Sequence, residues 1–275
     1  WYPSDGGYFP NPGSNIGCEA ILRKVDFPVA MAKFGQKQVK EQFGIDATYI
    51  PHGVETGRYF PYDSARKDWV LQKYSQKFGV DLRNRFIVGS VFRNQPRKAT
   101  DRWVRTIAYL DKKYPDSKAL FLAHTEISDP ASPHNIQYLL DRYKVGHRVL
   151  FTGMKSHSGL PDSEMPELYN LFDCHYTSST GEGFGVPLIE AASCGVPNVT
   201  TDYTSTDELL REHHAGLPVP LVGEEAGANV HSELLNKGTT TGSWHVDRAF
   251  IDPEKAADSL RSLEVDSSLR SELSK

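Results

Sequence analysis

The sequence predicts an α/β protein built on a doubly wound parallel sheet. From about residue 86 onward, short apolar segments alternate with segments of helical pattern. Such alternation is typical of a parallel sheet with helices packed on both faces. Polar or glycine-rich residues follow several of the apolar segments, and in these sheets ligands bind at the carboxyl ends of the strands. One pattern therefore predicts both the fold class and the edge of the sheet that holds a ligand.

Five strands and six helices are expected within this part of the chain. The predicted strands are residues 86–92, 119–124, 148–153, 173–179 and 197–202, with an extended edge at 217–221. The predicted helices are residues 101–112, 136–143, 165–172, one that begins at Pro187, 205–213 and 249–263. Thr100 is expected to cap the first helix and Asp252 the last, ahead of Pro253 in its first turn. Residues 224–244 have the character of an insertion, and 269–275 of a final short helix.

Composition places the chain among ordinary globular proteins. It has 275 residues, 39% hydrophobic and 24% charged, which fits one large domain or two small ones. A net charge of −4 gives no general reason to expect nucleic-acid binding. Three scattered cysteines (Cys18, Cys174 and Cys194) suggest reduced thiols and a cytoplasmic location. No apolar run reaches the length that spans a bilayer, and the first residues do not resemble a signal peptide.

The most informative stretch is GEGFGVPLIEAASCGVP, residues 181–197, in which a glycine-rich loop leads into a helix. Pro187 suits the first helical position, because the missing N–H is not needed there. The unpaired amides of the helix start and its partial positive charge form a binding site for a phosphate. Glu182 lies on the loop and Glu190 is expected in the first turn, so each carboxylate can face hydroxyl groups on one side of a diphosphate. This arrangement predicts a sugar-nucleotide site.

A purely structural interpretation of the same residues exists. A glutamate in the first turn of a helix is favourable against the helix dipole without any ligand. Glycines in a strand-to-helix turn can serve backbone geometry alone. The complete string of residues 181–197 favours the functional interpretation.

A basic loop, RNQPRK, follows the first predicted strand and carries Arg93, Arg97 and Lys98. Arginine can grip phosphate oxygens in a bidentate fork, and lysine acts as a point charge. Cations placed here would stabilise the negative charge that develops on a departing diphosphate. By itself the loop is better explained as a solvated basic segment, and the glutamate stretch reverses this preference in favour of phosphate binding.

The two glutamates separated by seven residues within EGFGVPLIE resemble the donor-site motif of retaining glycosyltransferases with the GT-B fold, family 4 type (glycosyl transferases group 1). The resemblance implies a Rossmann-like donor domain that binds a nucleotide sugar such as a UDP- or GDP-sugar. It also implies transfer of the sugar with retention of configuration, without a cofactor. No metal is expected, since cations and a helix terminus can offset the phosphate charge and no Asp-x-Asp motif flanks the site.

Carried over by position, the resemblance gives each motif residue a role. Glu182 would contact the transferred sugar and Glu190 the ribose hydroxyls. Arg93 and Lys98 would bind the phosphates, and with Glu182 they form the expected catalytic set. Many members place a glycine after this lysine, whereas this chain has Ala99, so Arg97 stays an alternative for either cation. Further substrate contacts are implied for Gly183, Phe184, Gly185, Val186, Pro187, Leu188, Met154, Lys155 and Thr125.

The resemblance also implies a domain organisation. Residues 1–50 would be the remnant of an N-terminal acceptor domain, with its last strand and helix within 26–45 and a loop before them. Residues 51–61 would be the interdomain linker, in which His52 is interpreted as structural, and 62–275 the donor-binding domain. Because the N-terminal domain of such enzymes usually exceeds a hundred residues, the chain is expected to be a fragment or a shortened form.

The expected activity is therefore that of a glycosyltransferase, although the chain alone can lack activity. The acceptor is open among glycans, lipids and small molecules, and peripheral contact with a membrane is open as well. Two alternatives remain at this point. One is a sugar-nucleotide epimerase on the same scaffold, and the other is a non-catalytic module that binds a nucleotide sugar.

Overall fold

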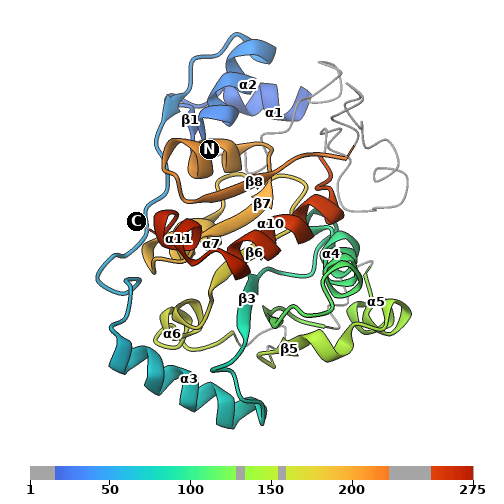
Figure 1. Ribbon diagram of the computed structural model, residues 1–275. Coiled ribbons are helices and arrows are strands. Elements are labelled where there is room, and N and C mark those ends of the chain that lie inside the picture. Colours follow the sequence, from blue (N-terminus) through green and yellow to red (C-terminus); the bar gives the residue numbers. More distant parts are fainter. Residues whose placement is uncertain (1–15, 128–133, 154–158, 223–248, 275) are drawn as a thin grey trace.

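The computed structural model describes residues 16–127, 134–153, 159–222 and 249–274. A six-stranded parallel sheet runs through its centre (Figure 1). The strand order is β5-β4-β3-β6-β7-β8, and every neighbouring pair is parallel. The strands are β3 Phe86–Val91, β4 Ala119–His124, β5 Val149–Phe151, β6 Cys174–Thr177, β7 Asn198–Thr201 and β8 Gly216–Val219. The predicted α/β class and parallel sheet are confirmed, and the predicted extended edge at 217–221 contains the edge strand β8.

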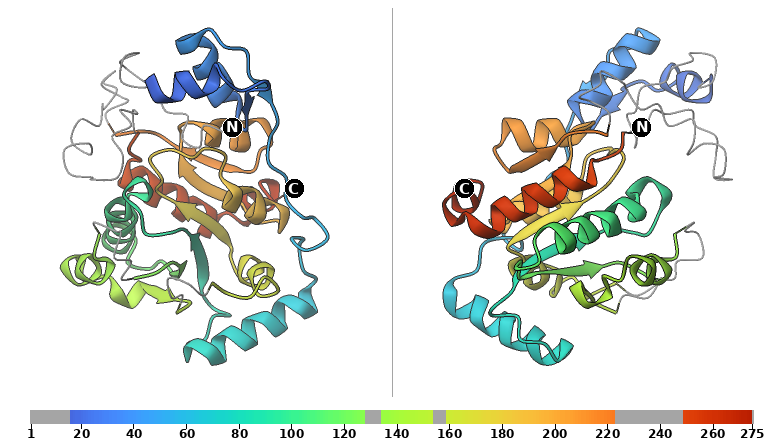
Figure 2. Two further views of the ribbon diagram at one scale, coloured as in Figure 1. Left: turned by 180° about the vertical axis from the view of Figure 1, so that it is seen from behind. Right: turned by 45° about the vertical axis from the view of Figure 1, so that its right-hand side comes forward.

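Helices cover both faces of the sheet (Figures 1 and 2). One face carries α4 Thr100–Lys113, α5 Ile136–Tyr143 and α10 Pro253–Val265. The other carries α3 Ser64–Phe78, α6 Met165–Asn170 and α7 Val186–Ser193. Successive residues of β3 alternate between the two cores, as the period of a strand requires: Phe86 and Val88 pack on the first side and Ile87 on the second. The short helix α11, Ser267–Glu272, follows α10.

The strand order reverses between β3 and β6. From β3 the chain proceeds outward through β4 to β5, and after returning to β6 it proceeds the other way through β7 to β8. The loops that leave the carboxyl ends of β3 and β6 therefore diverge and leave a crevice between them, the usual ligand position in such sheets. These loops carry the basic segment 93–98 and the glutamate segment 181–185.

One helix start and one helix interior differ from expectation. Ala99, not Thr100, precedes α4, with a left-handed φ of 44°, and the Thr100 hydroxyl donates to Asn94 Oδ1 at 3.0 Å instead of capping. Asp252 does cap α10, accepting from the Glu254 amide at 2.9 Å. The helix expected over 205–213 is a three-residue turn, α8 Ser205–Asp207, followed by a π-helical turn, Glu208–Glu212.

Residues 16–49 form a small unit beside α8 (Figure 1). It comprises α1 Ile16–Leu22, β1 Val29–Ala30, α2 Lys33–Phe43 and β2 Thr48–Tyr49, with β1 and β2 paired in parallel. The loop expected before residue 26 thus contains a helix. The strand expected at 28–34 is the shorter β1, and the helix expected at 35–43 is α2, which begins two residues earlier. A cluster that includes Leu22, Val39 and Phe43 fills its interior. The division of the chain at residues 50 and 61 stays a prediction. The expected insertion at 224–244 lies outside the described residues.

Gly89 provides a test of how tightly the sheet packs against Phe172, in the segment that joins α6 to β6. A methyl group at this position in β3 would lie 2.0 Å from a ring carbon of Phe172. We expect Gly89→Ala to lower the free energy of unfolding by about 1–3 kcal/mol through overpacking, as measured by urea denaturation. Gly35→Ala in α2 is the matched control, because nothing lies within 4 Å of its added methyl group. Equal stability of the two variants would contradict the packing described for β3.

Candidate functional site

A cavity of about 420 Å³ opens at the reversal of strand order. Its walls come from the ends of β3 and β4, the basic loop, the glutamate loop and the start of α7, and residues 31 and 52 before α3. They are Met31, His52, Val91, Phe92, Arg93, Arg97, Lys98, His124, Glu182, Gly183, Phe184, Gly185, Val186 and Pro187. Most residues that the sequence predicted for the site therefore meet around one cavity.

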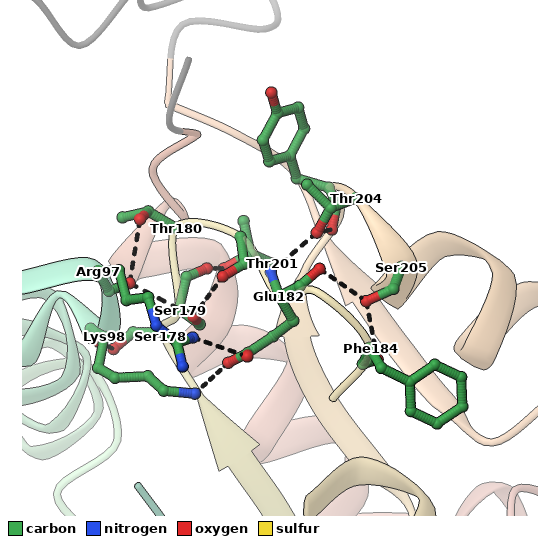
Figure 3. Close-up of polar contacts among 12 residues, drawn as sticks. Arg97, Lys98, Ser178, Ser179, Thr180, Glu182, Phe184, Thr201, Thr204 and Ser205 are labelled. Atoms are coloured by element: carbon green, nitrogen blue, oxygen red, sulfur yellow. Dashed lines mark hydrogen bonds and ion pairs between the residues drawn. The ribbon is translucent and has the colours of Figure 1, made fainter. Parts of the chain in front are cut away.

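Glu182 and the basic loop form a buried cluster of charges. Lys98, in the short 3₁₀ turn Pro96–Lys98, is 8% exposed and its ammonium pairs with Glu182 Oε1. Arg97 Nη1 lies 2.8 Å from Glu182 Oε2. One carboxylate thus contacts both cations, and Figure 3 shows it between them and the loop that follows β7. Arg93 lines the same cavity but is exposed.

The protonation of Glu182 follows from these contacts. Burial by itself would raise the pKa of this carboxyl, since it disfavours the charged form. Lys98 and Arg97 act in the opposite direction, and together they bring the pKa of Glu182 to about 2. The cluster therefore keeps a carboxylate at neutral pH inside the cavity wall.

Backbone contacts hold the basic and glutamate loops together next to these charges. The Arg97 carbonyl accepts from the Thr180 amide at 2.7 Å and from its hydroxyl at 3.0 Å. The Ser178 hydroxyl donates to the Lys98 carbonyl at 2.9 Å (Figure 3). Residues 178–180 follow β6 and the basic loop follows β3, so these bonds tie the ends of the two strands on either side of the reversal.

The start of α7 forms part of this cavity wall, because Gly185, Val186 and Pro187 line the cavity. The residue before the helix is Gly185, whose φ of 98° favours glycine, and no side chain caps the helix there. Val186 is the first helical residue and Pro187 the second, one position later than expected. Uncapped amides at a helix N-terminus are donors suited to an anion.

Glu190 occupies a different environment from Glu182. It is the fifth residue of α7 and so lies beyond the first turn, contrary to the sequence expectation. Its Oε2 accepts from the Tyr169 hydroxyl at 2.7 Å, and it also interacts with Tyr59. It is not among the residues that line the cavity. Leu188 likewise lies outside the lining and packs in a small cluster with Phe184.

Three further residues predicted to contact the substrate do not line the cavity or lie outside the described residues. Thr125 is 1% exposed, and its hydroxyl is a buried atom without a hydrogen-bond partner in the part of the chain that the structure describes. It follows β4 but does not line the cavity. Met154 and Lys155 lie outside the described residues.

The structure adds cavity residues that the sequence did not single out. His124 ends β4 and places Nδ1 2.9 Å from Thr152 Oγ1, and burial lowers its pKa. Its place at the end of a predicted apolar strand was a usable signal. His52, expected to be structural, packs edge-on against the Phe184 ring, with 5.3 Å between the two ring centroids, and it also lines the cavity. Met31 carried no local signal.

Two absences among the described residues bear on the site and its surroundings. No group of three or more His, Cys, Asp or Glu side chains there is arranged to hold a metal ion. Among the same residues, no helix combines the length and apolar character needed to cross a membrane.

Relatives of known activity cover most of this chain. It is 29% identical over 231 residues to a D-inositol 3-phosphate glycosyltransferase of Mycobacterium sp. (strain JLS), covering 82% of this chain and 48% of the relative. It is 24% identical over 239 residues to a GDP-mannose-dependent mannosyltransferase of Mycolicibacterium smegmatis that acts on phosphatidylinositol monomannoside, covering 83% and 58%. The chain thus spans about half the length of these relatives.

Solved structures share the fold. Anabaena HepE, in complex with UDP and glucose, superposes with a TM-score of 0.70 at 16% identity, over 100% of this chain and 64% of HepE. The C-terminal domain of a glycosyl transferase group 1 protein from Francisella tularensis gives a TM-score of 0.56 at 19% identity, over 81% and 93%. The expected fold, that of a GT-B donor domain, is confirmed. The family model described as glycosyl transferases group 1 matches residues 73–275, and the chain therefore belongs to this family.

Proposed function

We propose that this chain is the donor-binding part of a glycosyltransferase that transfers a sugar from a nucleotide sugar to an acceptor with retention of configuration. The observation that carries the proposal is the cluster of Glu182, Lys98 and Arg97 at the reversal of strand order. The names of relatives support the donor class, since one is GDP-mannose-dependent and another protein of the fold was solved with UDP and glucose.

The charges around the cavity suit a diphosphate. Arg93, Arg97 and Lys98 contribute three positive charges and Glu182 one negative charge, which leaves two positive charges on the lining. The amides at the start of α7 add a further partial positive charge. When the bond between the anomeric carbon and the diphosphate oxygen breaks, these groups would stabilise the charge left on the diphosphate. The acceptor hydroxyl would attack the anomeric carbon on the face that the diphosphate leaves, and its proton would pass to the departing diphosphate oxygen.

The two glutamates would serve different parts of the donor. The diphosphate would compete with the Glu182 carboxylate for Lys98 and Arg97, and the released carboxylate would then face hydroxyls of the sugar. Glu190 would hold the ribose. A carboxylate has about four acceptor positions, so hydrogen bonds from Tyr59 and Tyr169 leave room for a ribose hydroxyl.

The remaining parts of the proposal concern what surrounds the donor. The cations and the helix start would offset the phosphate charge without a metal ion. We propose a cytoplasmic location. The acceptor is a glycan, lipid or small molecule. Its identity would be set by a part of the enzyme that corresponds to the region of the relatives that this chain does not span.

The first test is calorimetric titration of the chain with UDP, GDP and ADP without metal. We expect one nucleotide to bind. The variants Arg93→Gln and Lys98→Ala should each lower the affinity for it about tenfold or more, since each removes a charge-assisted hydrogen bond. Arg93 is exposed, so its variant should stay folded, and circular dichroism checks both. Lys112→Ala, on the exposed side of α4, is the control and should bind within twofold of the parent chain.

The outcomes of this titration separate the alternatives. Absence of binding to all three nucleotides by the folded chain would contradict the donor site. If a nucleotide binds, nucleotide-sugar turnover by an enzyme with a complete N-terminal part should fall more in Lys98→Ala than nucleotide affinity does. Equal losses would exclude the leaving-group role of Lys98. Conversion of the donor without any acceptor would indicate an epimerase.

A second test uses the pH dependence of stability. The folded pKa of Glu182, about 2, lies below its ordinary value of 4.5, so its contribution is present above about pH 4.5 and is lost as the pH falls toward 2. We expect the free energy of unfolding of the parent chain, relative to that of Glu182→Gln, to fall by about 2 kcal/mol between pH 5 and pH 3. Urea denaturation across this range measures the difference. A difference independent of pH would show that the carboxylate is not stabilised by its cations.

A further inference from the structure

Thr204 has an unusual backbone for its residue type. Its φ is 62° and its ψ is −133°, a region that glycine adopts readily and β-branched residues avoid. The residue is 6% exposed and directly precedes α8, but its side chain makes no capping hydrogen bond to that helix. A threonine in this conformation suggests another role for its hydroxyl.

The hydroxyl contacts the glutamate loop. Thr204 Oγ1 accepts from the backbone amide of Glu182 at 2.9 Å and donates to the Tyr203 carbonyl at 2.7 Å. The neighbouring Ser205 Oγ lies 3.0 Å from the Glu182 carbonyl and 2.8 Å from the Phe184 carbonyl. Figure 3 shows these contacts on the side of Glu182 opposite Lys98 and Arg97. The backbone of Glu182 is thus held from the loop after β7 while its carboxylate reaches the loop after β3.

The glutamate loop needs such support. Glycines stand at positions 181, 183 and 185, so the backbone on both sides of Glu182 has wide conformational freedom. The carboxylate and the amides at the start of α7 must nevertheless hold fixed positions, because small displacements of groups around a reacting centre reduce their effect strongly.

We propose that Thr204 is a positioning residue of the donor site, whose hydroxyl fixes the Glu182 amide so that this carboxylate and the adjoining loop amides face the ligand. The proposal rests on the proposed function for its effect on binding. Thr206 supplies the contrast, because its hydroxyl accepts from the Tyr203 amide at 3.2 Å and lies near the Thr201 carbonyl, all within the same turn. A threonine that only stabilised the turn would have contacts of this kind.

The first measurement is amide hydrogen exchange at Glu182 by NMR, which needs no ligand. In Thr204→Gly, which relieves the backbone strain and removes the hydroxyl, we expect the Glu182 amide to exchange about tenfold faster or more, as expected for the loss of one hydrogen bond. Thr204→Ser keeps the hydroxyl and should preserve the slow exchange. The amide of Tyr176, in the buried strand β6, reports any change in overall stability. Thr206→Ala should leave the Glu182 amide unchanged.

The second measurement is titration of the same variants with the nucleotide that the parent chain binds. We expect Thr204→Gly to bind about tenfold more weakly although it is no less stable than the parent, and Thr204→Ser to bind within about threefold. Unchanged exchange in Thr204→Gly, unchanged affinity in that variant, or failure of serine to restore both would overturn the proposal. If the parent chain binds no nucleotide, the proposed function fails, and hydrogen exchange still decides whether Thr204 holds Glu182.

Discussion

The contact between Glu182 and the two cations of the basic loop is the interaction on which the site depends. Removal of a carboxylate and an ammonium from water costs several kcal/mol per ion unless the charges pair well, and here one carboxylate meets Lys98 and Arg97 together. The pairing bridges the loops that leave β3 and β6, where the strand order reverses. Hydrogen bonds from residues 178–180 to the basic loop reinforce it. The cavity keeps its shape because these two loops are fixed to each other.

Two residues next to this cluster adopt backbone conformations that favour glycine. Ala99 follows Lys98 with a φ of 44°, and Thr204 holds the Glu182 amide with a φ of 62°. Each such residue costs on the order of 1–3 kcal/mol, and strain of this kind gathers at functional sites. The glycine that many family members carry after the lysine has a physical explanation here, since the chain must turn into α4 through a left-handed residue. Alanine has neither a branched nor a bulky side chain, so it tolerates this conformation better than a β-branched residue would.

The site also depends on the residues before α3. Met31 and His52 line the cavity, and the His52 ring packs against Phe184 of the glutamate loop. The Glu208 carboxylate accepts from the Lys33 amide at 2.7 Å, across 175 positions of the chain, and so joins the start of α2 to the turn behind Thr204. Burial raises the pKa of Glu208, as expected for a carboxylate placed between packed elements. The small N-terminal unit and the glutamate loop thus both contact the segment that contains Thr204 and Glu208.

The sequence by itself determined the class of the sheet, most of its helices and strands, and the loops that carry Arg93, Lys98 and Glu182, because periodicity and glycine-rich turns are local patterns. It also brought these residues to one edge, since parallel strands end on the same side. Only the tertiary structure decided that Glu182 pairs with Lys98 across 84 positions, that Glu190 accepts a hydrogen bond from Tyr169, and that Thr204 holds the glutamate loop. Such contacts depend on which strands become neighbours and in what register, and no local pattern contains that information.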